Sequence, residues 1–164
     1  MKTKEFIFRQ TILKDVGQIL IMINRNAKAG KMLPKNKKQI FDLLLNYSVA
    51  VADDKVIGTC GCKIWVNESV EIISLTTLKR FQGQGIGTRL IQENIERGKS
   101  LGFKHFFAMT VVPDIFAKFG FKRVDYRKLS LKAKVWGDCA ACPYNASDPG
   151  HKKCKEKAVE LWLD

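Results

Sequence analysis

The sequence predicts an α/β (α+β) protein in which helices flank one mixed central sheet, and three observations support this prediction. Strand-like and helical stretches alternate along the 164 residues, and a glycine-rich loop joins one strand to one helix. Hydrophobic residues make up 46% of the chain, which is enough to form the core of a single domain. We therefore expect one domain over residues 1–164, with a cysteine-containing segment at about residues 132–157.

The N-terminal half has the periodicities of one strand, two helices and three further strands. Alternation over residues 6–10 predicts a strand, and Asp15 can start a helix over residues 16–29 that Gly30 ends. Asn36 is suited to cap a second helix. The apolar positions of that helix are Ile40, Phe41, Leu44 and Leu45. Strands are expected at residues 48–52, 56–66 and 70–78, the first two antiparallel around a turn at residues 53–55.

The C-terminal half begins with a helix over residues 85–100 that Gly102 ends. Its apolar side carries Ile86, Leu90, Ile91 and Ile95. A short apolar run at residues 105–110 predicts a buried strand, and Pro113 can open a short helix that continues through Phe119. A strand or hairpin is expected at residues 121–131 and a final strand at residues 158–163.

Three glycines at every second position, Gly83, Gly85 and Gly87, lie between a predicted strand and a predicted helix. Glycines let the backbone turn tightly and approach a ligand without intervening side chains. The first-turn N–H groups of the following helix have no partners within the helix, and the helix dipole favours an anion there. The loop therefore predicts a site for a cofactor that carries a pyrophosphate.

Neighbouring residues argue against the two commonest glycine-rich phosphate loops. A Rossmann fingerprint places an acidic residue about twenty positions on, where this chain has residues 99–101, Lys-Ser-Leu. A P-loop requires a lysine directly after its last glycine, and here Thr88 and Arg89 follow Gly87. The glycine pattern by itself is also compatible with a plain glycine-rich turn, which remains an alternative.

The loop resembles the acetyl-CoA site of the GNAT superfamily of N-acetyltransferases, whose motif Q/R-x-x-G-x-G/A is met by Gln82, Gly85 and Gly87. The order of elements is also similar to a GNAT domain over nearly the whole chain. This resemblance implies a sheet with splayed parallel strands and acetyl-CoA as cosubstrate. It implies main-chain contacts to the pantetheine arm from Leu75, Thr76 and Thr77, and loop contacts from Gln82, Gly83, Gln84, Gly85, Ile86, Gly87 and Thr88. The flanking cations are either phosphate ligands or solvated side chains: Lys79, Arg80 and Arg89.

Glu71 is the catalytic residue that the resemblance implies, as the general base that takes the proton of the amine. Strand alternation would place it on one face with Ile73, Leu75 and Thr77. The alternative interpretation of Glu71 is a surface glutamate near the start of a strand. The tyrosine that often protonates the leaving thiolate in this superfamily is replaced here by Phe116, so water, Tyr126 or Tyr47 remains open as the acid.

Three segments, at residues 29–35, 111–113 and 135–143, resemble the short single-domain N-acetylglutamate synthase group. This resemblance implies acetylation of a free amino acid, with glutamate the leading candidate, as in arginine biosynthesis. Two carboxylates in the acceptor would need cations, which Lys35 and Lys63 could supply. The chain has Lys35 and Ile73 where that group has arginine. The alternatives are another small amine, a protein acceptor, or a catalytically silent basic binding module.

Cysteine and histidine pairs near the C-terminus have the spacing C-x2-C-x8-H-x2-C and the residue types of a structural zinc site. The residues are Cys139, Cys142, His151 and Cys154. Reduced, packed or surface thiols are the alternative interpretation. Cys60 and Cys62 alternate on a predicted strand and are interpreted as core residues, and His105 as structural.

The formal net charge of +13 is spread along the chain, and no nucleic-acid-binding motif accompanies it. We interpret most of these cations as a solvated surface and expect no nucleic-acid partner. The N-terminus lacks the pattern of a signal peptide, and no apolar stretch approaches the length of a membrane span. These features predict a cytoplasmic location. The resemblance implies a small-molecule amine as the acceptor, and a homodimer stays open.

Overall fold

The computed structural model describes residues 5–125, 138, 142 and 154–164. Contacts group the chain into two compact units. The first unit comprises Met1–Lys63 and Ile72–Leu101, and the second comprises Ile64–Glu71 and Gly102–Asp164. Each unit is described by itself below.

Seven strands pair in the order β1-β2-β3-β4-β5-β7-β6. They are β1 (Ile7–Gln10), β2 (Tyr47–Ala52), β3 (Lys55–Ile64), β4 (Ser69–Thr77), β5 (His105–Thr110), β6 (Lys122–Val124) and β7 (Lys157–Trp162). β4 and β5 pair in parallel, whereas β1 with β2, β2 with β3, β5 with β7 and β6 with β7 are antiparallel. The mixed α/β fold predicted from the sequence is confirmed.

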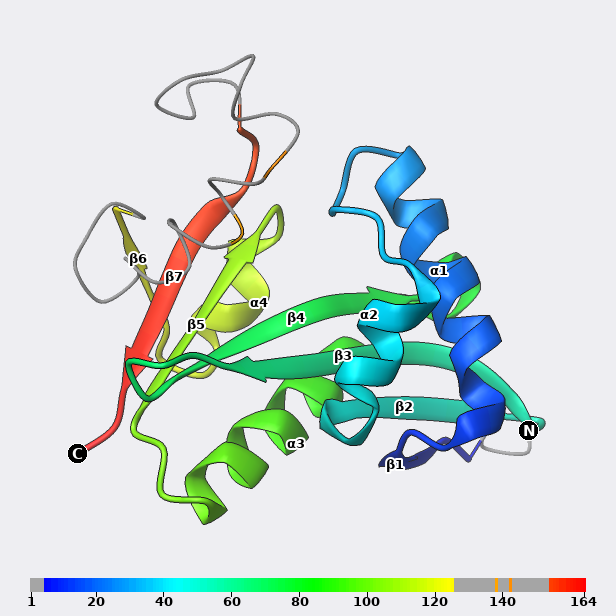
Figure 1. The fold of residues 1–164 in the computed structure, drawn as a ribbon, viewed down its shortest axis with the longest axis horizontal. Helices are drawn as coiled ribbons and strands as arrows, with labels where there is room; N and C mark the ends of the chain where they lie inside the picture. Colours follow the sequence, from blue (N-terminus) through cyan, green and yellow to red (C-terminus); the bar gives the residue numbers. More distant parts are fainter. Residues whose placement is uncertain (1–4, 126–137, 139–141, 143–153) are drawn as a thin grey trace. The chain divides into compact units, whose positions relative to one another are not determined.

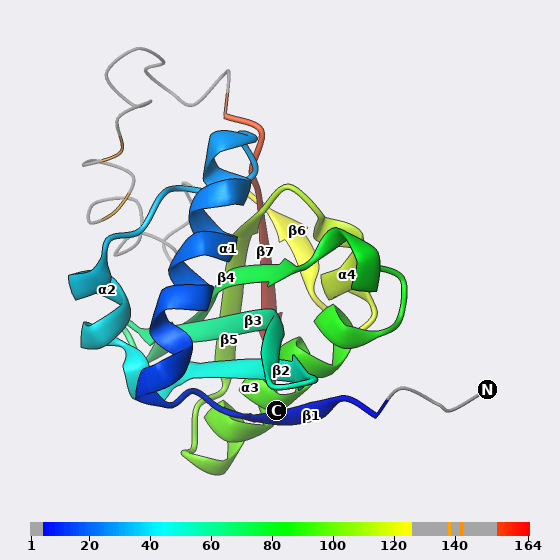
Figure 2. The same cartoon turned by 90° about the vertical axis from the view of Figure 1, so that its right-hand side faces the viewer.

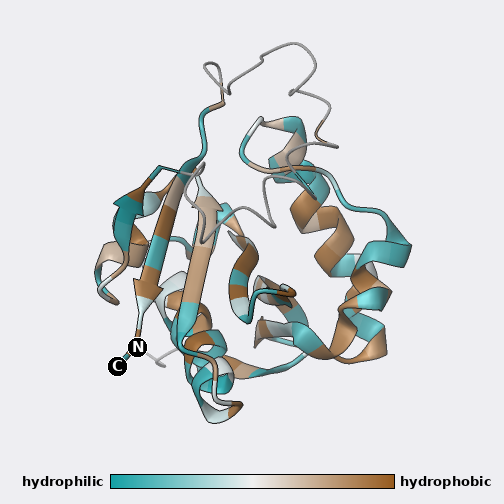
Figure 3. Ribbon diagram, turned by 60° about the vertical axis from the view of Figure 1, so that its left-hand side comes forward, coloured by the Kyte–Doolittle hydropathy of each residue, from teal (hydrophilic) through white to brown (hydrophobic). Residues whose placement is uncertain are grey.

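The first unit contains three α-helices: α1 (Val16–Lys28), α2 (Lys37–Asp42) and α3 (Ile86–Ser100). Figure 1 shows α2 in front of β2 and β3 and α3 behind them. α1 also lies over these strands, as Figure 2 shows. One core cluster joins α1, α2 and β2 through Val16, Ile19, Met22, Ile23, Ile40, Tyr47, Val49 and Val51. Figure 3 shows hydrophobic stretches of α1 beside hydrophilic ones, as expected of a helix with one buried face.

Gly58 on β3 fixes how closely α3 approaches the sheet. A Cβ added at Gly58 would lie 2.8 Å from Ile86 Cγ2 and 3.2 Å from Leu90 Cδ1. The first residues of α3 therefore rest directly on β3, which anchors the N-terminus of this helix.

Two boundaries of the first unit differ from the sequence prediction. Asn36 caps α2 as expected, because its Oδ1 accepts from Gln39 N while Gln39 Oε1 accepts from Asn36 N, both at 2.9 Å. However, α2 ends at Asp42, and Leu44–Asn46 forms a separate 3₁₀ turn. The predicted second strand also ends earlier, at Ile64, because the chain turns back there.

The second unit contains β5, β6, β7, the beginning of β4 and the short helix α4 (Pro113–Ala117). α4 ends before the predicted Phe119, because Gly120 at φ 87° closes the turn with a bond from its N–H to Ala117 O. Phe116 is buried and packs edge-to-face on Phe121 with the two ring centres 5.3 Å apart, so it is a core residue. β6 covers residues 122–124 of the strand predicted at 121–131, and residues 126–131 lie outside the described part of the chain.

Candidate active site

The loop between β4 and α3 requires glycine at two positions. Gly83 and Gly85 adopt φ 77° and 78°, in the left-handed region that side chains other than glycine rarely adopt. Within the described part of the chain, no heavy atom beyond the glycine and its two chain neighbours lies within 4 Å of a Cβ built at either residue. The loop therefore leaves space above its backbone, as the approach of a ligand requires.

The N-terminus of α3 presents backbone donors directly after this loop. Gly85 is the N-cap, and the first intrahelical bond runs from Arg89 N to Gly85 O at 2.9 Å. The N–H groups of residues 86–88 precede that bond, so the helix itself supplies no acceptor for them. The first turn carries no acidic side chain, so nothing in that turn opposes an anion. The loop fits the pyrophosphate of acetyl-CoA, which these N–H groups would hold.

Two glutamines of the loop hold its shape from within. Gln82 Nε2 donates to Thr77 O at 3.1 Å, and Gln84 Nε2 donates to Arg80 O at 3.3 Å. The side chain of Gln82, predicted as a cofactor contact, thus ties the loop to the end of β4. This explains why an amide suits the first position of the motif.

The flanking cations differ in what they contact. Arg89 Nε lies 3.0 Å from Glu93 Oε1, and its guanidinium lies 5.2 Å from the centre of the Phe8 ring. Arg80 lies over the Phe81 ring at 4.9 Å. Lys79, Arg80 and Arg89 are all exposed. Their role as phosphate ligands stays a prediction.

β4 does not alternate regularly, because Ser74 adopts φ 55°. Ile73 packs on the cluster formed by α1 and β2, and Ser74 Oγ lies 2.9 Å from Tyr47 Oη of the same cluster. Thr76 Oγ1 accepts from Asn26 of α1, so it also faces that helix. Two consecutive residues on one side are typical of a β-bulge. The prediction that Glu71, Ile73, Leu75 and Thr77 share a face assumed regular alternation, which Ser74 interrupts, and the directions of Leu75 and Thr77 stay a prediction.

Glu71 lies in the second unit and is almost fully buried, with 2% of its surface exposed. Its backbone pairs with Phe107 of β5. Its Oε2 accepts a hydrogen bond from Trp65 Nε1 at 2.9 Å. The interpretation of Glu71 as a surface glutamate is wrong, since a carboxylate this deeply buried must be held by specific partners.

The residues predicted for the acceptor lie in the first unit. Lys35 is half-buried, and Asn24 of α1 clamps its backbone: Nδ2 donates to Lys35 O and Oδ1 accepts from Lys35 N, each at 2.9 Å. Lys63 is half-buried near the end of β3, and Ile73 packs against the α1 core. Sequence reasoning missed Asn24 and Trp65, because neither belongs to a motif.

Other predicted residues are placed as follows. Tyr47 is fully buried with its hydroxyl against Ser74, and Tyr126 lies outside the described residues. Cys60 and Cys62 are buried, which confirms their core role. Of the four residues predicted to bind zinc, Cys142 and Cys154 are partly buried thiols. Cys139 and His151 lie outside the described residues, so the zinc site stays a prediction.

His105 joins three strands of the second unit through a buried hydrogen-bond chain. Its Nε2 lies 2.9 Å from Glu160 Oε2 on β7, and its Nδ1 lies 2.6 Å from Ser69 Oγ on β4. A carboxylate only accepts, so Nε2–H donates to Glu160 and Nδ1 of the neutral ring accepts from the hydroxyl. Trp162 stacks on the ring at 4.0 Å. These contacts support the predicted structural role of His105.

Because His105 is buried, we expect the protein to lose stability in mild acid. Burial lowers the pKa of His105 below its ordinary value, and this outweighs the opposite effect of Glu160. The unfolded chain then binds more protons than the folded chain, so the free energy of unfolding falls as pH drops below about 6.5 towards the folded-state pKa. Urea unfolding across this range should show the fall in the native protein and a smaller fall in His105→Gln. Equal pH dependence in both proteins would contradict the assignment.

The comparisons with known proteins agree with this geometry. The acetyltransferase (GNAT) family model matches residues 18–121, more than half of the chain. The chain belongs to the GNAT family. It is therefore an acetyl-CoA-dependent N-acetyltransferase, and the enzyme class and cosubstrate predicted from the glycine loop are confirmed.

Two relatives share moderate sequence identity with the chain. An uncharacterised N-acetyltransferase of Chlorobaculum tepidum is 27% identical over 143 residues, which are 87% of this chain and 91% of that protein. An amino-acid acetyltransferase of Ralstonia nicotianae is 30% identical over 103 residues, which are 62% of this chain and 23% of that enzyme. The match with the second relative therefore covers only a minor part of that larger enzyme.

Solved structures share the fold at low identity. N-acetylglutamate synthase of Neisseria gonorrhoeae, complexed with coenzyme A and N-acetyl-glutamate, aligns with TM-score 0.79 and 19% identity over 99% of this chain and 36% of that chain. A Mycobacterium tuberculosis protein bound to CoA and a second ligand aligns with TM-score 0.78 and 19% identity over 96% of this chain and 99% of that chain. In the part of the chain that the structure describes, no helix is long and apolar enough to cross a membrane.

Proposed function

We propose that this GNAT enzyme transfers the acetyl group of acetyl-CoA to the amine of a free amino acid, with glutamate the leading candidate. The observation that supports the proposal is β4, which bears the buried Glu71, continues through Leu75–Thr77 and is followed, after a 3₁₀ turn at Lys79–Phe81, by the glycine loop. In the proposal, Leu75–Thr77 pair with the pantetheine arm and the loop holds the pyrophosphate.

Acetyl transfer follows from the chemistry of these groups. The thioester supplies an activated acetyl carbonyl, and a neutral amine attacks it as the C–N bond forms and the C–S bond breaks. Glu71 takes the proton that the attacking amine loses. The leaving thiolate takes up a proton from water or from a residue not yet assigned. The N-terminus of α3 binds the pyrophosphate and so fixes the position of the thioester.

The amino-acid acceptor is supported by three observations. A relative 30% identical over 103 residues is an amino-acid acetyltransferase. A neighbour in fold is an N-acetylglutamate synthase. The clamp from Asn24 holds the backbone at Lys35, which would present this lysine to a substrate carboxylate from a fixed position.

The acceptor prediction is tested by removing the charge of Lys35. We expect Lys35→Met to lower kcat/KM for glutamate by about 10-fold or more, because a carboxylate loses a charged partner worth about 1.5–3 kcal/mol. Product formation from glutamate and leucine, measured by mass spectrometry, gives the selectivity directly. Lys38→Met is the matched control, since Lys38 is exposed and pairs with Asp42.

Three outcomes of this assay separate the candidate functions. Preference for glutamate that falls in Lys35→Met but not in Lys38→Met supports the proposal. Turnover of polyamines or peptides without turnover of free amino acids would replace it with another small amine or a protein acceptor. Acetyl-CoA binding without turnover of glutamate, leucine or any other free amino acid would contradict the proposed acceptor.

A further inference from the structure

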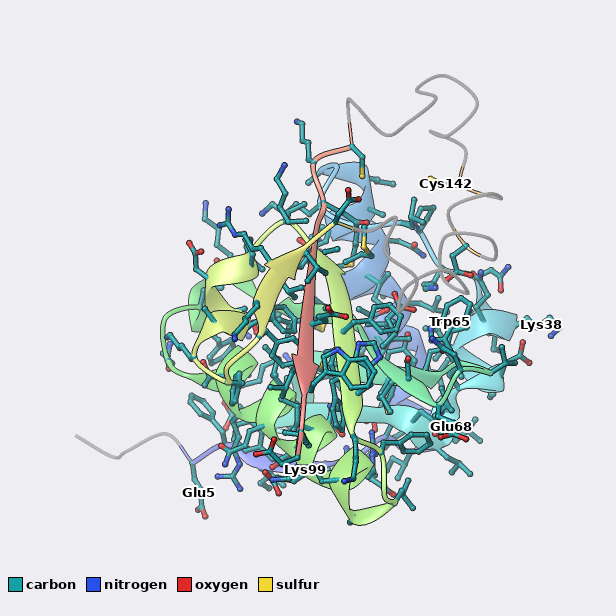
Figure 4. All side chains as sticks on the ribbon, turned by 90° about the vertical axis from the view of Figure 1, so that its left-hand side faces the viewer. Glu5, Lys38, Trp65, Glu68, Lys99 and Cys142 are labelled. Atoms are coloured by element: carbon teal, nitrogen blue, oxygen red, sulfur yellow. The ribbon has the colours of Figure 1, made fainter. Side chains whose placement is uncertain are left out.

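Trp65 lies on the turn between β3 and β4 and reaches the carboxylate of Glu71. Its indole Nε1 donates to Glu71 Oε2 at 2.9 Å, across six residues of chain. Figure 4 labels Trp65 together with Glu68 of the same turn. The contact joins two residues of the second unit, and one of them is the proposed base.

The indole is held in place from two directions. Trp65 N donates to Ser69 O at 2.9 Å and Trp65 O accepts from Glu68 N at 3.0 Å, which closes the turn. Glu68 adopts φ 60°, as such a tight turn requires. The ring itself packs, with Met109 and Val124, on the cluster of Phe107 and Ala158. Trp65 thus has little freedom to move away from Glu71.

The register of the strands places Glu71 beside the same cluster. Glu71 pairs with Phe107, and Phe107 pairs with Glu160 on β7. The backbone of Glu71 is therefore fixed by β5 while one carboxylate oxygen is fixed by the indole. When the backbone and one carboxylate oxygen of a glutamate are both held, the plane of the carboxylate and the direction of its lone pairs are defined.

We propose that Trp65 is the positioning residue of the general base. This inference rests on the proposed function, in which Glu71 takes the proton of the amine. An indole N–H only donates, so Trp65 cannot take the proton itself. By holding one carboxylate oxygen of Glu71, it aims the carboxylate before the acceptor binds.

Other titratable groups lie near Glu71, and their effect on the kinetics must be distinguished from the effect of Trp65. His105 is two residues from Phe107 on β5, and Glu160 lies opposite Phe107 on β7. These two groups bond to each other at 2.9 Å. The His105→Gln variant measures their contribution to any pH profile.

The experiment replaces Trp65 with phenylalanine, which keeps an aromatic ring and removes the N–H donor. We expect kcat to fall about 10- to 100-fold, the range of a lost hydrogen bond to a charged group. The KM for acetyl-CoA should stay within about twofold of the native value, because the pyrophosphate loop is unchanged.

Trp162→Phe is the matched control for this substitution. Trp162 is a second tryptophan of the same unit, is 61% exposed and stacks on His105. Its substitution should leave kcat unchanged. A fall in kcat of equal size in Trp162→Phe would assign the effect to general repacking and would overturn the inference.

A second replacement keeps the test decisive if Trp65→Phe unfolds. Benzothienylalanine at position 65 has the shape of tryptophan with sulfur in place of N–H, and should reproduce the slower turnover. Native kinetics in this variant would overturn the role of Trp65. If Glu71→Gln keeps full activity, Glu71 is not the base and the proposed function is wrong. This result is distinct from native kinetics in the position-65 variants, which would overturn only the role of Trp65.

Discussion

Replacing Glu71 by glutamine is expected to lower kcat about 100- to 10,000-fold, the usual contribution of a general base. The side chain is 2% exposed and is held by Trp65 Nε1, so glutamine can occupy the same space and keep an oxygen for the indole. Acetyl-CoA binding should change little, because the glycine loop is untouched. Initial rates at saturating acetyl-CoA, with binding followed by thermal shift, check both parts.

Glu68→Gln is the matched control for this substitution, because Glu68 is an exposed glutamate of the neighbouring turn with the same chemistry. We expect native rates in Glu68→Gln. Rates of Glu71→Gln that equal the native rates across the pH range would show that Glu71 is structural and that the base lies elsewhere.

The second large effect is expected at Gly85, the N-cap of α3. Alanine at φ 78° is strained by about 1–2 kcal/mol. The loop can relieve this strain only by leaving the conformation that presents the N–H groups of α3. We expect the Kd of acetyl-CoA to rise about tenfold or more. Isothermal titration calorimetry measures this change directly.

Gly102→Ala separates strain from binding in this test. Gly102 adopts φ 89°, and, as at Gly85, no heavy atom lies within 4 Å of an added Cβ. Both variants should therefore lose similar stability, but only Gly85→Ala should bind acetyl-CoA more weakly. Equal Kd values in the two variants would remove the glycine loop from the cofactor site.

The fold was predictable because local patterns and tertiary structure agree in most of the chain. The strand at residues 105–110, the cap at Asn36 and the helix after the glycine loop all match the structure. The predicted boundaries of elements were wrong where tertiary contacts decide them, as at the C-terminal end of α2, which is Asp42.

The site was predictable only in part, for a physical reason. Glycines at positive φ leave a sequence signal, since few other residues tolerate that backbone. The bulge at Ser74 leaves no such signal, because serine gives no indication of φ 55°. The clamp of Asn24 on Lys35 and the bond from Trp65 to Glu71 join residues 11 and 6 positions apart whose types fit many surroundings.

The most direct test of the account follows a labelled acetyl group from acetyl-CoA into a mixture of free amino acids, a polyamine and a lysine-containing peptide. Mass spectrometry identifies which acceptor gains the label. We predict N-acetylated amino acid, chiefly N-acetylglutamate, made by the native enzyme and nearly absent with Glu71→Gln. Label found only in the peptide or the polyamine would contradict the proposed acceptor.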